Sequence, residues 1–100
     1  VEIGHYIAGP FCTRILADMG AEVIKIEPPG GDPIRKFFDS IGTESPVNPV
    51  FDMDNRGKRS VVLDLKHKPA RDALLKLAET ADVLVYNIRP QAMARLGLSY

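Results

Sequence analysis

Residues 1–20, which read VEIGHYIAGPFCTRILADMG, constrain the fold more than any other stretch. The short run Val1–Ile3 is typical of the end of a buried strand. Gly9 allows the backbone to turn sharply and to come close to a ligand. Pro10 suits the start of a helix, because its missing N–H is not needed there. The stretch therefore predicts a strand, a turn and a helix whose free N–H groups could receive a phosphate or another anion.

The helix predicted at Pro10–Met19 has one apolar face, which we expect to pack on a sheet. That face carries Phe11, Cys12, Ile15, Leu16 and Met19, with Thr13, Arg14 and Asp18 opposite. Gly20 is a suitable C-terminal cap. A thiolate would be stabilised in the first helical turn, but Cys12 falls on the apolar face. We therefore expect Cys12 to be a small buried residue and not a nucleophile.

Strands and helices alternate along the rest of the chain. We expect strands at Glu22–Glu27, Ser60–Leu65 and Asp82–Tyr86, and helices at Pro69–Glu79 and Pro90–Leu96. The region 28–59 is long, poorly periodic and rich in proline, which is typical of a functional loop or a covering excursion. This order predicts an α/β fold, a Rossmann-like parallel sheet with flanking helices.

Composition limits the function further. The chain has 100 residues, enough for one domain at most, and at 45% hydrophobic it is too apolar for disorder. Its formal charge of zero argues against broad binding of nucleic acid or an anionic membrane, and no apolar run approaches a membrane span. The single cysteine fits a reducing compartment. We expect a cytoplasmic protein, or a mitochondrial or peroxisomal matrix protein in a eukaryote, of which this chain is a piece.

Ligands of parallel sheets bind at the carboxyl ends of the strands. The stretches that fall there are Ile7–Pro10, Glu27–Asp32, Leu63–Lys66 and Asn87–Pro90. Lys66 and Arg89 could hold phosphates at this edge, and Arg95 could bind an anion or interact with the end of its own helix. The basic cluster Asn55–Ser60 is either a second phosphate site or a solvated loop.

Other kinds of site have weaker support. His5 and His67 lack partners at metal-ligand spacing, so we expect no metal site. Glu27 ends a strand where a dinucleotide fold places its ribose-binding acid, but G-x-G-x-x-G is missing, which leaves NAD binding as an alternative. No P-loop sequence is present.

The chain resembles the amino-terminal region of the class III (CaiB/BaiF-type) CoA-transferases over nearly all of its length. The stretches that carry the resemblance are AGPFCTRILADMGAEVIKIEPPGGD, NRGKRSVVLDLK and ADVLVYNIRPQAMARLGLSY. The family includes formyl-CoA transferase, carnitine CoA-transferase and α-methylacyl-CoA racemase. The resemblance implies that residues 1–100 are the amino-terminal part of a Rossmann-like large domain that binds CoA.

The resemblance also implies site residues, partners and substrates. The residues that would lie along the pantetheine are Ile7, Ala8 and Gly9. The adenosine phosphate end would be held by Leu63, Asp64, Leu65 and Lys66. The family's N-F-x segment is matched by Asn87, Ile88 and Arg89, and the basic residue beyond it by Arg95. It implies an interlocked homodimer acting on a CoA thioester and a carboxylic acid, without a tightly bound cofactor. Pro28, Tyr86 and Ile88 depart from the family pattern, in which Arg, Glu and Phe occur.

We expect no catalytic residue in this chain, because the family's nucleophilic Asp lies downstream of residue 100. In the transferases that Asp attacks the thioester, giving an acyl anhydride and then an aspartyl-CoA thioester. In the racemase a downstream His and Asp exchange the α-proton. The long insert Ile34–Asp54 favours a transferase over the racemase. An NAD-dependent oxidoreductase and a non-catalytic binding fragment remain as alternatives from other classes.

Overall fold

A computed structural model describes residues 1–36 and 48–98, and in them the strands form one parallel sheet. The strands are β1 (Glu2–Ile3), β2 (Ile24–Glu27), β3 (Arg59–Val62) and β4 (Val85–Tyr86), in the order β3-β2-β1-β4. In register, Glu2 lies opposite Lys25 on one side and Val85 on the other. The predicted α/β fold with a parallel sheet is confirmed.

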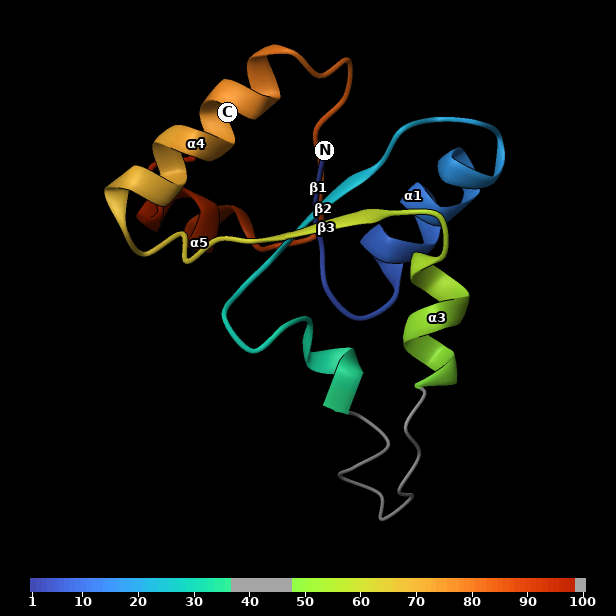
Figure 1. Ribbon diagram of the computed structural model, residues 1–100. Helices are drawn as coiled ribbons and strands as arrows, with labels where there is room; N and C mark the ends of the chain where they lie inside the picture. The colour runs from blue at the N-terminus through green and yellow to red at the C-terminus, as the bar shows by residue number, and fades with distance from the viewer. Residues whose placement is uncertain (37–47, 99–100) are drawn as a thin grey trace.

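Helices cover both faces of this sheet (Figure 1). α1 (Ala8–Asp18) and α3 (Pro49–Asn55) lie on one side, and α4 (Lys68–Glu79) and α5 (Pro90–Arg95) lie on the other. The chain therefore has the doubly wound arrangement in which ligands bind at the carboxyl ends of the strands.

The strands are shorter than predicted. β3 ends at Val62, and after Leu63, whose N–H still donates to the Glu27 carbonyl, the chain leaves the sheet. Asp64 starts a turn there, in which its carboxylate accepts a hydrogen bond from the Lys66 N–H. Likewise, β4 keeps only the last two residues of the predicted Asp82–Tyr86.

The region predicted to be poorly periodic contains two short helices. η1, a 3₁₀ helix, spans Pro33–Lys36, and α3 follows at Pro49–Asn55. Asn48 caps α3 by accepting hydrogen bonds from the Val50 and Phe51 N–H groups, and Pro49 fits its first turn. The central part of the predicted excursion, 37–47, lies outside the described residues.

A small apolar core lies between the sheet and the α4–α5 layer. It consists of Ile3, Ile26, Leu74 and Met93, with Leu63, Leu65, Leu77 and Ile88 packed around it. Leu74 is 1% exposed, and Leu77 is half-buried, so these two residues turn the apolar side of α4 toward the core.

We expect Leu74→Ala to destabilise the folded protein by about 2–3 kcal/mol. The cost should lie at the lower end of the range for this substitution, because Leu74 borders a surface groove with Leu84 and Leu98 and the site can partly collapse. Urea unfolding of the full-length parent protein would measure it. Leu75→Ala is a matched control, because Leu75 is 49% exposed on the same helix. Equal losses in the two variants would contradict the core assignment.

The predicted orientation of α1 is wrong. Its apolar face is exposed, with Phe11 at 45% and Met19 at 80%, and Cys12 is exposed as well. Gly9, Pro10 and Thr13 face the sheet instead. The reason is the carboxylate of Glu2, which lies under the helix and needs a polar partner. The Thr13 hydroxyl supplies one by donating a hydrogen bond to Glu2 Oε2 over 2.6 Å.

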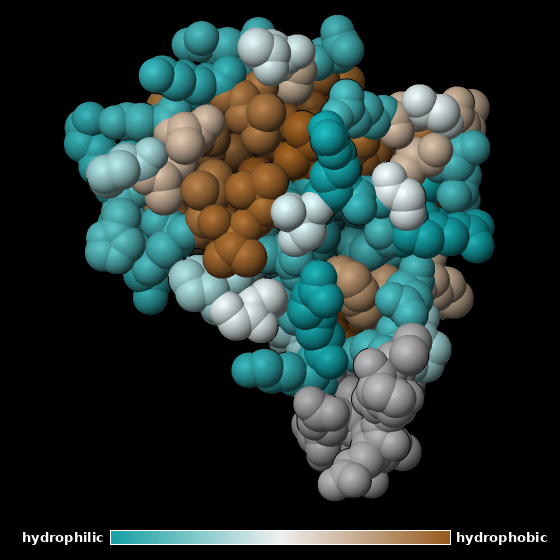
Figure 2. All heavy atoms as spheres, in the orientation of Figure 1, coloured by the Kyte–Doolittle hydropathy of each residue, from teal (hydrophilic) through white to brown (hydrophobic). Residues whose placement is uncertain are grey.

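The exposed surface includes much apolar area. Figure 2 shows brown, apolar side chains gathered in one area on the α4–α5 side, bordered by teal, polar ones. Among the exposed large apolar side chains are Val61, Val62, Leu75, Val83 and Leu84. Of the helices in 1–36 and 48–98, none combines the length and the apolar character needed to cross a bilayer.

Candidate functional site

The four stretches expected to meet at the carboxyl edge do so. Ile7–Pro10 follows β1, Glu27–Asp32 ends and follows β2, Leu63–Lys66 follows β3, and Asn87–Pro90 follows β4. Strand order reverses between β1 and β4, and such a switch point opens a crevice between neighbouring turns. β3 and β4 lie at opposite edges, so their turns are separated by about 14 Å across three strand spacings. An elongated ligand is needed to touch both.

Asn87 joins the turns after β1 and β4 at the switch point. Its Oδ1 accepts a hydrogen bond from the His5 N–H over 3.1 Å, and its Nδ2 donates one to the His5 carbonyl over 3.0 Å. Gly9 leaves room beside it, because a Cβ on Gly9 would lie 3.2 Å from Asn87 Oδ1, closer than an ordinary van der Waals contact. The structure thus brings together two of the residues expected in the site, Gly9 and Asn87.

The first backbone N–H groups of α1 lie at this edge, and no side-chain cap is present among the described residues. The Ile7 N-cap makes no side-chain capping bond, and the first turn contains no acidic residue. Ile7 is 57% exposed, and Ala8 is exposed beside it. These N–H groups and the positive end of the helix dipole can attract an anion.

The turn Leu63–Lys66 is held by Arg71 of α4, a residue that was not predicted to belong to the site. Arg71 Nη1 donates hydrogen bonds to the carbonyls of Leu65 and Lys66, over 3.0 and 3.1 Å. Leu63 and Leu65 themselves pack against the core, as does Ile88 in the turn after β4. What these three residues can offer a ligand is therefore mainly their backbone.

Two exposed cationic residues, Lys66 and Arg89, lie in the turns at this edge. Arg95 is exposed as well, in the last turn of α5. None forms an ion pair within the part of the chain that the structure describes, in contrast to most of the other basic residues there. Lys66 and Arg89 thus combine a position in the carboxyl-edge turns with a charge that no acidic partner in the described chain neutralises.

The basic cluster Asn55–Ser60 has a different role. Lys58 Nζ is buried against Glu2, Arg56 Nη2 lies 3.0 Å from Asp18 Oδ2, and Arg59 Nη1 lies 2.5 Å from Glu22 Oε1. Each of these cations already has an acidic partner within the chain. The cluster ties α3 and β3 to the α1 side of the molecule, and the phosphate-site alternative is not supported.

Buried charged side chains form a network next to the carboxyl edge. This network was not predicted from the sequence. Glu2, Lys25, Asp32 and Lys58 have side chains that are 0–2% exposed. Lys25 Nζ lies 3.0 Å from Glu2 Oε1 and 2.9 Å from Asp32 Oδ2. Lys58 Nζ lies 2.7 Å from Glu2 Oε2 and donates hydrogen bonds to Asn55 Oδ1 and the Pro10 carbonyl. Burial lowers the pKa of Lys58, and the hydrogen bond to Glu2 opposes that effect.

Glu27 is occupied by donors of its own chain. Arg35 donates to both of its carboxylate oxygens, over 2.7 and 2.9 Å, and the Ser60 hydroxyl and the Asp32 N–H donate to it as well. Arg35 in turn stacks on the Phe51 ring, 3.6 Å from its centroid. Both oxygens of Glu27 are therefore used to join β2, β3 and η1. Glu27 therefore has no free oxygen with which to bind a ribose, and the alternative of NAD binding is not supported.

Acid should destabilise the protein through Glu27. Burial raises the pKa of this carboxyl, but the hydrogen bonds from Arg35, Ser60 and Asp32 outweigh burial and lower the pKa to about 2, from an ordinary 4.5. Because the folded-state pKa is depressed, the stabilisation is complete above about pH 4.5 and is lost as the pH falls toward 2.

We expect Glu27→Gln to flatten the dependence of the unfolding temperature on pH between 5 and 3, relative to the unsubstituted full-length parent. Thermal unfolding at several pH values would measure it. Glu79→Gln, at an exposed position of α4, should keep the natural slope. Parallel curves for all three proteins would show that Glu27 is not a source of acid sensitivity.

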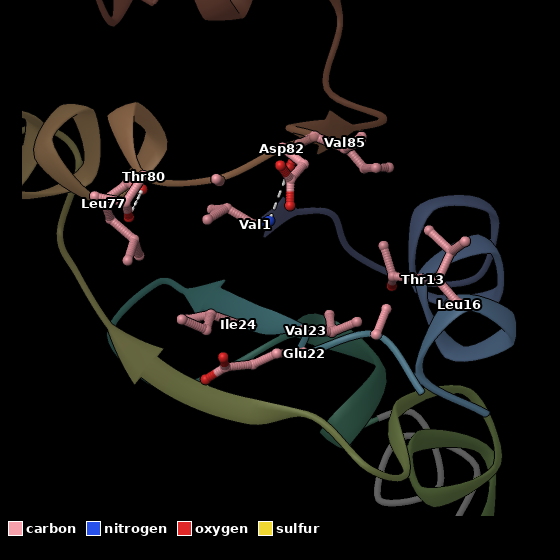
Figure 3. Close-up of a pocket in the computed structure, with 13 residues that line it drawn as sticks. Val1, Thr13, Leu16, Glu22, Val23, Ile24, Leu77, Thr80, Asp82 and Val85 are labelled. Carbon is pink, nitrogen blue, oxygen red and sulfur yellow. Dashed lines mark hydrogen bonds between the residues drawn. The ribbon is translucent and has the colours of Figure 1, made fainter. Parts of the chain in front are cut away.

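The pocket drawn in Figure 3 lies at the opposite, amino edge of the sheet. Val1, Val23 and Val85, at or near the starts of their strands, line it together with Leu16 of α1 and Leu77 of α4. It is mostly apolar, and none of the residues expected to bind CoA lines it. The candidate site is therefore the carboxyl edge and not this pocket.

The strand order and its switch point define a Rossmann-like α/β fold. The model of a family described as CoA-transferase family III matches residues 1–100. The chain thus belongs to CoA-transferase family III, the family that the sequence resembles.

Individual relatives agree with this membership. The chain is 45% identical over 102 residues to the succinyl-CoA:mesaconate CoA-transferase of Haloarcula hispanica, covering 100% of this chain and 26% of the relative. It is 46% identical over 101 residues to the acetyl-CoA:oxalate CoA-transferase of Acetobacter aceti, covering 100% of this chain and 25% of that protein. The chain thus spans about a quarter of the length of the curated relatives it matches.

Solved structures share the fold. A CaiB/BaiF family protein from Brucella suis matches with a TM-score of 0.87 and 35% identity, covering 99% of this chain and 27% of that protein. A protein from Mycobacterium tuberculosis named Rv3272 matches with a TM-score of 0.83 and 40% identity, covering 98% of this chain and 27% of the other.

Proposed function

We propose that this chain is the CoA-binding part of an enzyme that moves CoA between carboxylic acids. The observation that carries the proposal is the carboxyl edge, where the uncapped start of α1 lies between the turns that carry Lys66 and Arg89, two exposed cations without acidic partners in the described chain. Relatives named as CoA-transferases support the reaction class. The nucleophile is a downstream Asp, as the family resemblance implies.

In the proposed arrangement CoA lies across the carboxyl edge. Lys66, Arg89 and Arg95 bind its phosphates, and the backbone of Leu63–Leu65 contacts the adenosine end. The pantetheine runs past Ile7, Ala8 and Gly9, with Asn87 and Ile88 beside them. The separation of about 14 Å between the outer turns suits an elongated ligand.

The substrates of the whole protein are a CoA thioester and a carboxylic acid. The relatives' printed names include succinyl-CoA with mesaconate and acetyl-CoA with oxalate. Their diversity supports the general reaction and not one acid pair. An interlocked homodimer, a cytoplasmic or organellar matrix location and membership of a larger CoA-binding domain belong to the same proposal, because the family resemblance implies them or the single cysteine favours them.

The proposal is tested by calorimetric titration of the full-length parent protein with CoA, with NAD as the comparison ligand. We expect CoA to bind and NAD not to bind. A subsequent screen would mix acyl-CoA donors with carboxylate acceptors and detect transfer of CoA. Binding of NAD without CoA would overturn the proposal. Exchange of the α-proton of a 2-methylacyl-CoA, without any transfer to an acceptor, would identify the racemase instead.

A further inference from the structure

The turn between β1 and α1 contains a backbone conformation that L residues rarely adopt. Tyr6 has φ +62°, the left-handed region, and it is the one residue other than glycine with a positive φ among those the structure describes. A side chain with a Cβ is disfavoured there, so the surrounding structure has to hold it. Tyr6 directly precedes Ile7, Ala8 and Gly9, the residues that lead into α1.

The carboxylate of Asp32 contacts the backbone of Tyr6. Asp32 Oδ1 accepts a hydrogen bond from the Tyr6 N–H over 3.1 Å and another from the Ile34 N–H over 3.0 Å. In Figure 1 the loop after β1 and the loop that leads to η1 leave the sheet on the same side. Asp32 therefore connects two loops that are far apart in the chain, with a sequence separation of 26 between the bonded residues.

Asp32 is itself fixed from the sheet. Its side chain is 1% exposed, and Lys25 Nζ, also 1% exposed, lies 2.9 Å from its Oδ2. Its N–H donates a hydrogen bond to Glu27 Oε1 over 2.9 Å. A buried carboxylate costs folding free energy unless it is paired and hydrogen-bonded. Here Lys25 on β2 offsets part of the cost as an ion-pair partner of Oδ2, although that oxygen accepts no hydrogen bond in the described chain, and Oδ1 accepts hydrogen bonds from the Tyr6 and Ile34 N–H groups.

We propose that Asp32 is a positioning residue for the proposed CoA edge: its buried carboxylate fixes Tyr6 and so sets the path by which the chain enters α1. The inference rests on the proposed function for its effect on CoA, but not for its effect on the turn. Asp32 does not itself touch the ligand. It acts through the backbone of Tyr6.

The test compares Asp32→Ala, which removes the acceptor, with Asp32→Asn, which keeps an oxygen where Tyr6 needs one. Amide hydrogen exchange of the full-length parent, resolved to single residues by mass spectrometry, reports on the turn without any ligand. We expect the Tyr6 N–H to exchange at least about tenfold faster in Asp32→Ala and within about threefold of the natural rate in Asp32→Asn. The His5 N–H, which Asn87 holds, should stay protected in both.

Two results would overturn the proposal. Unchanged Tyr6 exchange in Asp32→Ala would show that the carboxylate does not hold the turn. Equally faster exchange at Tyr6, His5 and β1 would show a general structural role in place of positioning. Asp72→Asn is the control, because Asp72 is exposed on α4 and makes only a surface pair with Lys68 among the described residues.

A second pair of variants tests the same idea should Asp32→Ala be too unstable for exchange measurements in the natural background. Glycine adopts positive φ without strain, whereas alanine does not. Introducing Asp32→Ala, which removes the acceptor, should therefore lower the unfolding temperature less in a Tyr6→Gly protein than in a Tyr6→Ala protein. Equal losses in the two backgrounds would contradict the proposal.

Titration with CoA then measures the consequence for binding. We expect the Kd for CoA to rise about tenfold in Asp32→Ala and to stay near the natural value in Asp32→Asn and Asp72→Asn. An unchanged Kd in Asp32→Ala would refute the effect on the CoA edge. If the unsubstituted parent does not bind CoA, the proposed function fails, while Tyr6 exchange still decides whether Asp32 positions the turn.

Discussion

Glu2→Gln should be the most damaging of the isosteric substitutions considered, costing about 3–5 kcal/mol of folding free energy. Glu2 is fully buried, forms ion pairs with Lys25 and Lys58, and accepts a hydrogen bond from the Thr13 hydroxyl. Glutamine has the same shape, so no cavity forms. It removes the negative charge between two buried ammonium groups and places an amide donor next to one of them. The loss is that of an uncompensated buried charge.

Glu22→Gln is the matched control for this prediction. The same chemical change is made there on an exposed pair with Arg59, whose two side chains are 65% and 74% exposed. Such pairs contribute less than about 1 kcal/mol. Urea unfolding of the full-length parent, followed together with limited proteolysis of its amino-terminal region, would compare the two. If Glu2→Gln proved as mild as Glu22→Gln, the buried network would not be a source of stability.

Removing both Lys66 and Arg89 should weaken CoA binding by about 10²- to 10⁴-fold. Each charged hydrogen bond to a phosphate contributes about 1.5–3 kcal/mol, and each 1.4 kcal/mol corresponds to about tenfold in Kd. Because both side chains are exposed, stability should change little. The single variants Lys66→Ala and Arg89→Ala should each account for about 10- to 100-fold.

The control for the double variant removes the same charges elsewhere. Lys68→Ala with Arg56→Ala also deletes one lysine and one arginine, and both side chains form exposed surface pairs, with Asp72 and Asp18. Calorimetric titration with CoA should give the natural Kd for this control. Equal affinity in the control and in the Lys66–Arg89 variant would remove both residues from the site.

The sheet and its carboxyl edge were predictable because local signals and topology agree. Gly20 and Gly97 follow the ends of α1 and α5 with φ values of +99° and +72°. Short strands that alternate with helices are typical of a parallel sheet. From that point the positions of Lys66 and Arg89 follow, since a strand's carboxyl end is fixed by its direction.

What the sequence concealed depends on contacts across the chain. The spacing of apolar residues predicted that Phe11 and Ile15 face the sheet. Thr13 faces it instead, because its hydroxyl donates a hydrogen bond to the buried carboxylate of Glu2. Lys25 and Lys58 look like ordinary surface residues in a list of charges, and their burial follows only from a partner that lies 23 or 56 residues away. The role of Asp32 depends in the same way on a turn that lies 26 residues away in the chain, at the same edge of the sheet.

The buried network also constrains the order of events while the chain is being made. Glu2 leaves the ribosome long before Lys25, and Lys58 follows later still, at a sequence separation of 56 from Glu2. A lone carboxylate cannot be buried without large cost, so β1 cannot settle under α1 until both lysines have been synthesised. Cotranslational folding of this domain should therefore wait for the arrival of β3, and a pause in translation before Lys58 would extend the time for which the apolar sheet surface stays open to chaperones.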